Sequence, residues 1–127
     1  FAPKDHPYAK RRTVQEWTRA AHVVVAGQGE EPGPIERAVT KRRLDRHVKV
    51  IAPGFLAALA LAGECNALFT TLRQPFEPFA AALGLSVSAT PFALPNVSAA
   101  LVRRAEFSDP FERWLGEMAD RAFDRNA

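Results

Sequence analysis

The chain has 127 residues, of which 47% are hydrophobic and 24% are charged. A chain of this size buries roughly two-thirds of its unfolded surface, which excludes both a disordered tail and a multidomain assembly. Seventeen Lys and Arg against fourteen Asp and Glu leave a formal net charge of +3, a mildly basic balance that permits a polyanionic partner without requiring one.

The single cysteine, Cys65, excludes an internal disulfide and any zinc site built on paired cysteines. A chain without disulfides fits the reducing cytoplasm, which is the location we expect. The most apolar stretch, Phe55 to Ala62, is far too short to span a bilayer, and no signal peptide opens the sequence. Because the first residue is Phe1 rather than Met, we expect a chain that was processed, trimmed or cut from a longer one.

In chain order, Thr13 to Glu16 form a capping box that predicts a short helix through Arg19. Three consecutive valines then predict a buried strand over His22 to Ala26. Three further strands follow at 48–52, 67–72 and 85–90, and a fourth at 97–103. Between them the sequence predicts a helix over 35–44, an internal helix over 55–62 that is ended by Gly63, and a helix that starts at Pro75 and ends at Gly84.

The last predicted helix follows a second capping box at Asp109 to Glu112 and runs to about Phe123. Its spacing predicts a buried apolar face made of Phe111, Trp114, Leu115, Met118 and Ala122. Strands that alternate with helices predict an α/β fold with a largely parallel sheet.

A catalytic reading of Cys65 would require a base such as His22 or His47 beside it, and a buried structural thiol is the simpler interpretation. The three histidines lack the spacing of metal ligands, so no metal site and no cofactor are predicted. Gly27 and Gly29 form part of a glycine-rich loop, but the acidic residues that follow exclude a nucleotide phosphate site.

Two basic clusters, at 10–12 and at 41–43 with Arg46, leave open a nucleic-acid-binding role, although no aromatic residues stand between them for base stacking. A solvated surface is the alternative interpretation. The Pro53-Gly54-Phe55 turn aims a helix N-terminus at the carboxyl edge of the sheet, where the free N–H groups favour anions. A plain strand-to-helix connection explains the same turn equally well.

The order of several motifs resembles the LysR-type transcriptional regulators. Pro3-Lys-Asp-His-Pro-Tyr-Ala9 resembles their His-Pro-Leu-Ala segment, and the strand, buried helix and strand from Val50 to Leu72 follow in the same order. The motifs at 83–85, 91–95 and 101–104 continue this order. Asp109-Pro-Phe-Glu-Arg-Trp-Leu115 looks like the ending of a branch near the nodulation regulators.

The resemblance implies a fragment of a C-terminal effector-binding domain, similar in fold to periplasmic binding proteins of type II. Residues 1–5 would be a hinge strand, 6–91 the second α/β subdomain, and 92–127 the hinge return with the last strand and helix of the first subdomain. The hinge residues would be Pro3, Pro91 and Pro95. The winged helix-turn-helix, the linker helix and the first half of the effector-binding region would lie outside this chain.

The resemblance also implies an effector between the subdomains, a small organic acid or an aromatic metabolite. It assigns the contacts to Gln28, Gly29 and Glu30, to Pro53, Gly54 and Phe55, and to Thr70. No catalytic residue is implied. The implied partners are a second copy of the chain and promoter DNA, the latter only through the N-terminal domain that this chain lacks, with no membrane.

The sequence leaves four interpretations of the chain's function open. The chain is a ligand-sensing part of a LysR-type bacterial regulator, a solute-binding protein of the same fold, a small α/β enzyme that uses Cys65, or a stand-alone nucleic-acid binder. Because a helix and a strand at the C-terminal end would lack their normal sheet, exposed apolar surface and self-association are also expected.

Overall fold

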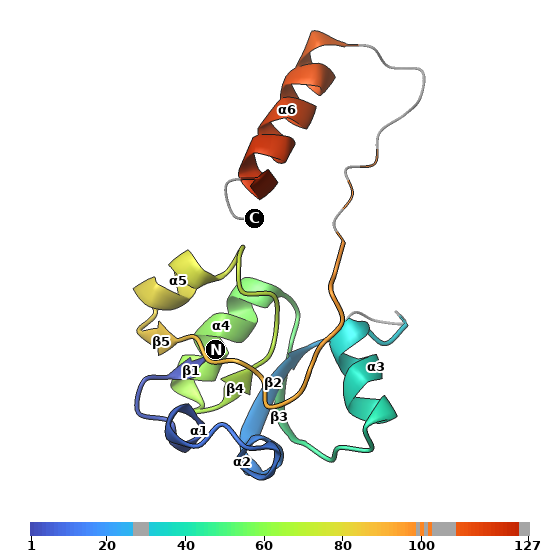
Figure 1. Ribbon diagram of the computed structural model, residues 1–127. Helices are drawn as coiled ribbons and strands as arrows, with labels where there is room; N and C mark the ends of the chain where they lie inside the picture. The colour runs from blue at the N-terminus through green and yellow to red at the C-terminus, as the bar shows by residue number, and fades with distance from the viewer. Residues whose placement is uncertain (27–30, 99, 101, 103–108, 125–127) are drawn as a thin grey trace. The chain divides into compact units, whose positions relative to one another are not determined.

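The computed structural model describes residues 1–26, 31–98, 100, 102 and 109–124. The chain divides into two compact units, Phe1–Pro95 and Asn96–Ala127, and each is described by itself (Figure 1). The first unit is a mixed α/β structure with a parallel sheet, as the alternation of strands and helices predicted.

The parallel sheet has three strands, β2 (Ala21–Val25), β3 (His47–Ala52) and β4 (Leu68–Phe69), in the order β3-β2-β4. Val25 is in register with Ala52, so the carboxyl ends of β2 and β3 meet at one edge. The strand predicted over 67–72 contains only two paired residues, because β4 leaves β2 after Phe69.

Side chains on β2 and β4 alternate between two apolar clusters, as the strand period of two requires. Val23 and Phe69 pack into a cluster with Leu59 of helix α4 (Phe55–Glu64). Leu68 packs on the other face, in a cluster that includes the buried Trp17. Around β2 and β4 the sheet is therefore covered on both faces, whereas most residues of the edge strand β3 are exposed.

Helix α4 corrects two sequence-based expectations. It passes through Gly63 to Glu64 and ends at Cys65, and the following Asn66 adopts the left-handed conformation with φ of 49°. Asparagine tolerates this conformation, so it terminates the helix where glycine was expected to. The helix is also not internal on all sides, since Phe55 and Leu56 are exposed while Leu59 is fully buried.

Besides α4, three helices precede or connect the strands of the sheet: α1 (Pro7–Lys10), α2 (Val14–Arg19) and α3 (Pro34–Lys41). The predicted cap of α2 is confirmed, because Thr13 Oγ1 accepts a hydrogen bond from the Glu16 amide at 3.2 Å. Helix α1 was not predicted; His6 Nδ1 caps it by accepting a hydrogen bond from the Tyr8 amide at 3.1 Å.

A second, two-stranded sheet pairs β1 (Ala2–Pro3) with β5 (Leu85–Ser86) in antiparallel orientation. The strand predicted over 85–90 is thus only two residues long. Helix α5 (Glu77–Ala82) starts after Pro75, which lies in the preceding turn, and has Pro78 in its first turn instead. Gly84 terminates this segment with φ of 71°, as predicted.

The second unit contains helix α6 (Pro110–Asp124). Asp109 caps it as predicted, with its Oδ1 accepting from the Phe111 amide at 3.0 Å. The strand predicted over 97–103 is absent among its described residues 97, 98, 100 and 102. Within this unit the apolar face of α6 is not buried, since the side chains of Phe111, Trp114, Leu115, Met118 and Ala122 are all exposed.

Candidate ligand-binding pocket

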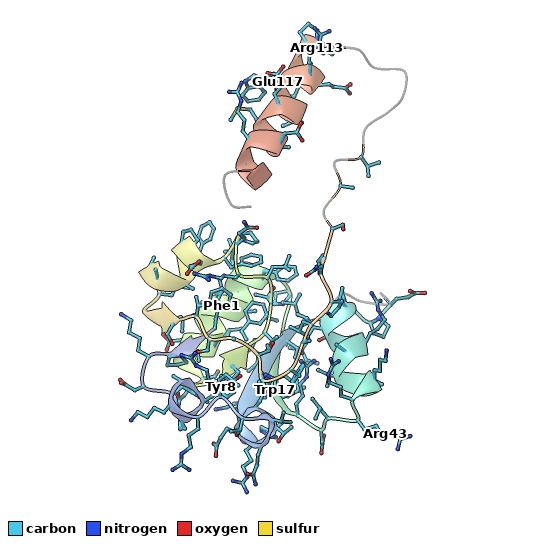
Figure 2. The ribbon with its side chains drawn as sticks, in the orientation of Figure 1. Phe1, Tyr8, Trp17, Arg43, Arg113 and Glu117 are labelled. Atoms are coloured by element: carbon cyan, nitrogen blue, oxygen red, sulfur yellow. The ribbon has the colours of Figure 1, made fainter. Side chains whose placement is uncertain are left out.

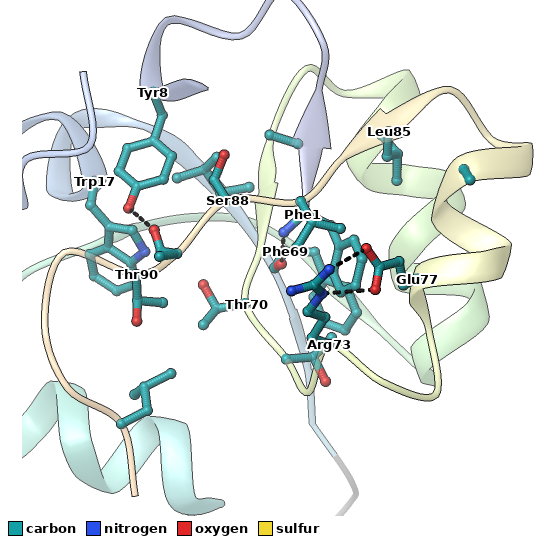
Figure 3. A pocket seen from close by; sticks show the side chains of 17 residues that line it. Phe1, Tyr8, Trp17, Phe69, Thr70, Arg73, Glu77, Leu85, Ser88 and Thr90 are labelled. Carbon is teal, nitrogen blue, oxygen red and sulfur yellow. Dashed lines mark hydrogen bonds and ion pairs between the residues drawn. The ribbon is translucent and has the colours of Figure 1, made fainter. Parts of the chain in front are cut away.

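The first unit contains a cavity of about 610 Å³ (Figure 3). It opens where β1, the end of β4, α5 and the segment after β5 come together. Its lining consists of Phe1, Ala2, Tyr8, Trp17, Leu68, Phe69, Thr70, Thr71, Arg73, Glu77, Ala81, Leu85, Val87, Ser88, Ala89, Thr90 and Leu94.

Aromatic side chains form much of the cavity wall. Trp17, Phe69 and Tyr8 are 1%, 2% and 4% exposed, so their positions are set by packing in the core. The Tyr8 hydroxyl donates a hydrogen bond to the Ala89 carbonyl at 2.7 Å. Burial raises the pKa of Tyr8 above its ordinary value of 10.0, so this side chain stays uncharged at neutral pH.

Hydroxyl groups line the same cavity. Thr70 and Thr71 follow β4, and Ser88 and Thr90 belong to the segment after β5 (Figure 3). The Thr90 hydroxyl donates to the Phe92 carbonyl at 2.8 Å. Within the part of the chain that the structure describes, the hydroxyls of Thr70, Thr71 and Ser88 have no hydrogen-bond partner. These three groups can therefore donate to or accept from a bound molecule.

The two charged side chains of the lining form an ion pair with each other. Arg73 Nε and Nη2 lie 2.8 and 2.9 Å from the two carboxylate oxygens of Glu77. The hydrogen bond from Arg73 holds the pKa of Glu77 below its ordinary value. Both side chains are solvent-accessible, so the pair stands at the rim of the cavity.

The segment 87–95 forms one wall of the cavity and is held by three side chains. Tyr8 binds it at Ala89, and Trp17 packs edge-to-face on Phe92 with the ring centroids 5.1 Å apart. The Arg42 guanidinium lies 5.2 Å from the Phe92 centroid and donates from Nη2 to the Ala93 carbonyl at 2.7 Å. This wall is therefore fixed by residues of α1, α2 and the end of α3.

One of the predicted effector residues lies in the cavity. Thr70 lines it, whereas Pro53, Gly54 and Phe55 lie at the carboxyl edge of the parallel sheet and are not part of the lining. The Phe55 ring instead stacks on Phe76, with the centroids 5.2 Å apart.

Gln28, Gly29 and Glu30 lie outside the described residues. Pro3 stands in β1, next to the cavity residue Ala2, and Pro91 and Pro95 stand in the wall segment 87–95.

Several lining residues were not predicted from the sequence. Trp17 was placed in the α2 helix without a role, and Ser88 and Thr90 were assigned to a strand. The contact between Tyr8 and Ala89 joins positions 81 residues apart, and no local pattern encodes such a contact. The only available signal was the cluster of small hydroxyl residues at 86–90.

The catalytic interpretation of Cys65 gains no support. Its Sγ has no hydrogen-bond partner among the described residues, and Lys49 Nζ contacts only its carbonyl oxygen at 3.1 Å. His22, the base considered for it, is fully buried and uses Nε2 to contact the Trp17 carbonyl at 2.7 Å.

Over residues 1–26, 31–98, 100, 102 and 109–124, no group of three or more His, Cys, Asp or Glu side chains could hold a metal ion. No helix in the same described part is long and apolar enough to cross a membrane.

The basic clusters lie on the surface. Lys10, Arg11 and Arg12 are exposed beside the short helices α1 and α2. In the second cluster Arg46 is neutralised by Glu36 at 2.7 Å, and Arg42 is bound to the wall segment. Figure 2 shows Arg43 pointing away from the sheet. These contacts favour the interpretation as a structured, solvated surface.

No model of a known protein family matches the chain, whereas comparison with individual known proteins finds relatives. The chain is 33% identical over 126 residues to the HTH-type transcriptional activator NagR of a Ralstonia species, covering 91% of this chain and 39% of NagR. It is 25% identical over 121 residues to the HTH-type transcriptional regulator LinR of Sphingobium indicum, covering 93% and 40% respectively.

A solved structure also resembles the chain. The probable transcriptional regulator PA0477 from Pseudomonas aeruginosa superimposes with a TM-score of 0.64 at 36% identity, over 74% of this chain and 32% of PA0477. The chain spans about two fifths of the length of the curated relatives that it matches. Together with the order of its motifs, these relatives place the chain among the LysR-type HTH transcriptional regulators of bacteria.

Proposed function

We propose that this chain is the ligand-sensing part of a LysR-type transcriptional regulator, without catalysis of its own, and that a small organic effector binds in the cavity around Thr70. In this proposal residues 6–91 form the second subdomain of an effector-binding domain similar to periplasmic binding proteins. Residues 1–5 and 92–127 form the hinge strand, the hinge return and the last elements of the first subdomain.

The cavity carries this proposal. Its volume of about 610 Å³ lies in the range of small-molecule sites, roughly 300 to 1,000 Å³. Small-molecule sites are mostly apolar with a few convergent polar groups, and here buried aromatic rings stand beside the unpaired hydroxyls of Thr70, Thr71 and Ser88. Thr70 is also the position at which the family resemblance and the cavity agree.

The wall segment 87–95 offers a route from the bound effector to the rest of the regulator. Its residues 87–90 and Leu94 line the cavity, and the chain continues directly from Pro95 into the second unit. If this segment has two conformations, a ligand that binds one of them more tightly raises the fraction of molecules in that conformation. We propose that sensing acts in this way within a cytoplasmic homodimer, whose promoter contacts are made by a DNA-binding domain outside this chain.

A titration with two small aromatic probes, benzyl alcohol and benzoate, tests the proposal by the amide chemical shifts of the isotope-labelled chain. We expect at least one probe to bind with a dissociation constant of about 1 mM, as befits so small a molecule. Replacing Thr70→Val removes one hydrogen-bonding group and should weaken binding about fivefold.

The matched control is Thr40→Val, because Thr40 is exposed on α3 and does not line the cavity. Its affinity should equal that of the unaltered chain. Binding that is unaffected by Thr70→Val, or the absence of binding by both probes, contradicts the proposed role of the cavity.

A further inference from the structure

We propose that the cavity selects an uncharged, hydroxyl-bearing aromatic ligand in preference to a carboxylate, an inference that rests on the proposed function. The family resemblance leaves both organic acids and aromatic metabolites open. The charges and hydrogen-bonding groups of the lining separate these two classes.

The positive charge of the cavity lining is already compensated within the protein. Arg73 is the one cationic side chain among the described lining residues, and both of its contacting nitrogens are bound to Glu77. A carboxylate ligand would have to compete with the Glu77 carboxylate for the same guanidinium. It would also approach the negative charge of Glu77 itself, and like charges repel at short range.

No other group of the described lining adds positive charge at neutral pH. The Phe1 nitrogen donates to the Phe69 carbonyl at 2.8 Å and is therefore already paired. The Tyr8 hydroxyl is neutral and already donates to Ala89. A ligand anion would therefore be desolvated without an unpaired cation to receive it.

The hydroxyl groups of the cavity lining favour a ligand that carries a hydroxyl. The hydroxyls of Thr70, Thr71 and Ser88 have no partner among the described residues, and each can both donate and accept. A ligand hydroxyl has the same dual capacity and satisfies such groups without introducing charge. The buried rings of Trp17 and Phe69 supply apolar contact for an aromatic ring beside them.

The decisive experiment compares benzyl alcohol with benzoate, two probes of similar size that differ in charge, on the unaltered chain and on Glu77→Gln. In the unaltered chain we expect benzyl alcohol to bind at least fivefold more tightly than benzoate. Glu77→Gln removes the competing carboxylate and leaves Arg73 free, so the ratio of the affinity for benzoate to the affinity for benzyl alcohol should rise at least fivefold.

The outcomes separate this inference from the proposed function. If benzoate binds the unaltered chain more tightly, and Arg73→Gln weakens that binding, the ligand class is wrong while the proposed sensing role stands. If neither probe binds, the proposed function itself fails. Since Arg73 and Glu77 are both exposed, these variants should fold, and their unfolding midpoints check that directly.

Discussion

The guanidinium of Arg42 covers the ring of Phe92, with its central carbon 5.2 Å from the ring centroid. The same guanidinium donates to the Ala93 carbonyl, and the Phe92 ring also makes an edge-to-face pair with Trp17. Phe92 therefore contacts both a cation and a buried indole. This arrangement fixes the wall segment 87–95 against α2 and the end of α3.

Shortening Phe92 tests this arrangement. Phe92→Ala should lower the free energy of unfolding by about 2 kcal/mol, because a half-buried aromatic ring loses its contacts with Trp17. Arg42→Ala should cost about 1 kcal/mol. Urea denaturation of both variants and of the double variant gives the coupling between the two side chains, expected at about 0.5 kcal/mol or more.

Lys41→Ala provides the control for this cycle, because Lys41 is an exposed neighbour with no contact to Phe92. Its effect should be close to zero. A coupling of zero between Arg42 and Phe92 would show that the cation contributes nothing to holding the segment.

The buried histidine predicts a pH dependence of stability. Burial lowers the pKa of His22 to about 4, from 6.5 for an unperturbed histidine. The unfolded state therefore binds a proton that the native state does not bind between these two values. Stability should fall as the pH drops from 6.5 toward 4, by up to about 1.4 kcal/mol per pH unit from this group, and should be unaffected by it above pH 7.

The variant His22→Gln isolates the contribution of this histidine, since burial also lowers the pKa of His6, which acts in the same direction. Its unfolding free energy should depend less steeply on pH in this window than that of the unaltered chain. The exposed His47 serves as the comparison, and His47→Gln should keep the original slope. Equal slopes for all three chains would contradict the assignment.

The two faces of α4 should respond differently to the same substitution. Leu59 is fully buried against β2 and β4, so Leu59→Ala should cost about 3 kcal/mol through lost burial and the remaining cavity. Leu56 is 54% exposed, and Leu56→Ala should cost less than about 1 kcal/mol. Chemical denaturation measures both, and similar losses would show that α4 is buried on all sides.

The left-handed conformation of Arg43 offers a stabilising substitution. Its φ of 53° is costly for a residue with a Cβ, by about 1 to 2 kcal/mol, whereas glycine adopts it freely. After the entropic penalty of glycine, Arg43→Gly should raise the unfolding free energy by about 0.5 kcal/mol. Arg43→Ala keeps the strain and should give no gain, so a thermal or urea midpoint that rises equally for both would refute this reasoning.

Local hydrogen bonding explains which elements could be predicted from the sequence. Thr13 and Asp109 cap their helices through contacts within three residues, so the capping patterns located both helix starts. The valines of β2 likewise indicated a strand buried on both faces. The end of α4 was misplaced because Asn66, rather than Gly63, takes the left-handed conformation that terminates the helix. The lengths of short strands depend instead on tertiary pairing, and β4 stops at Phe69, where its pairing with β2 ends.

The candidate site was less accessible to sequence reasoning for the same physical cause. Thr70 was assigned through the family resemblance, which implies an effector contact at the end of the strand that follows the buried helix. The groups opposite it, Tyr8 and Ser88, reach the cavity only through the pairing of β1 with β5 and the bond from Tyr8 to Ala89. Such pairings join distant parts of the chain and leave no periodic signal in the sequence.

The most direct test of the central claim is to map where a ligand binds. Benzyl alcohol is titrated into the isotope-labelled chain, and the amide shift of each residue is followed. Binding in the cavity predicts that the largest saturable changes occur at Thr70, Thr71 and Ser88 to Thr90. Changes confined to Gly54, Phe55 and Leu56 at the start of α4, or no saturable change at all, would contradict the claim that the cavity is the sensing site.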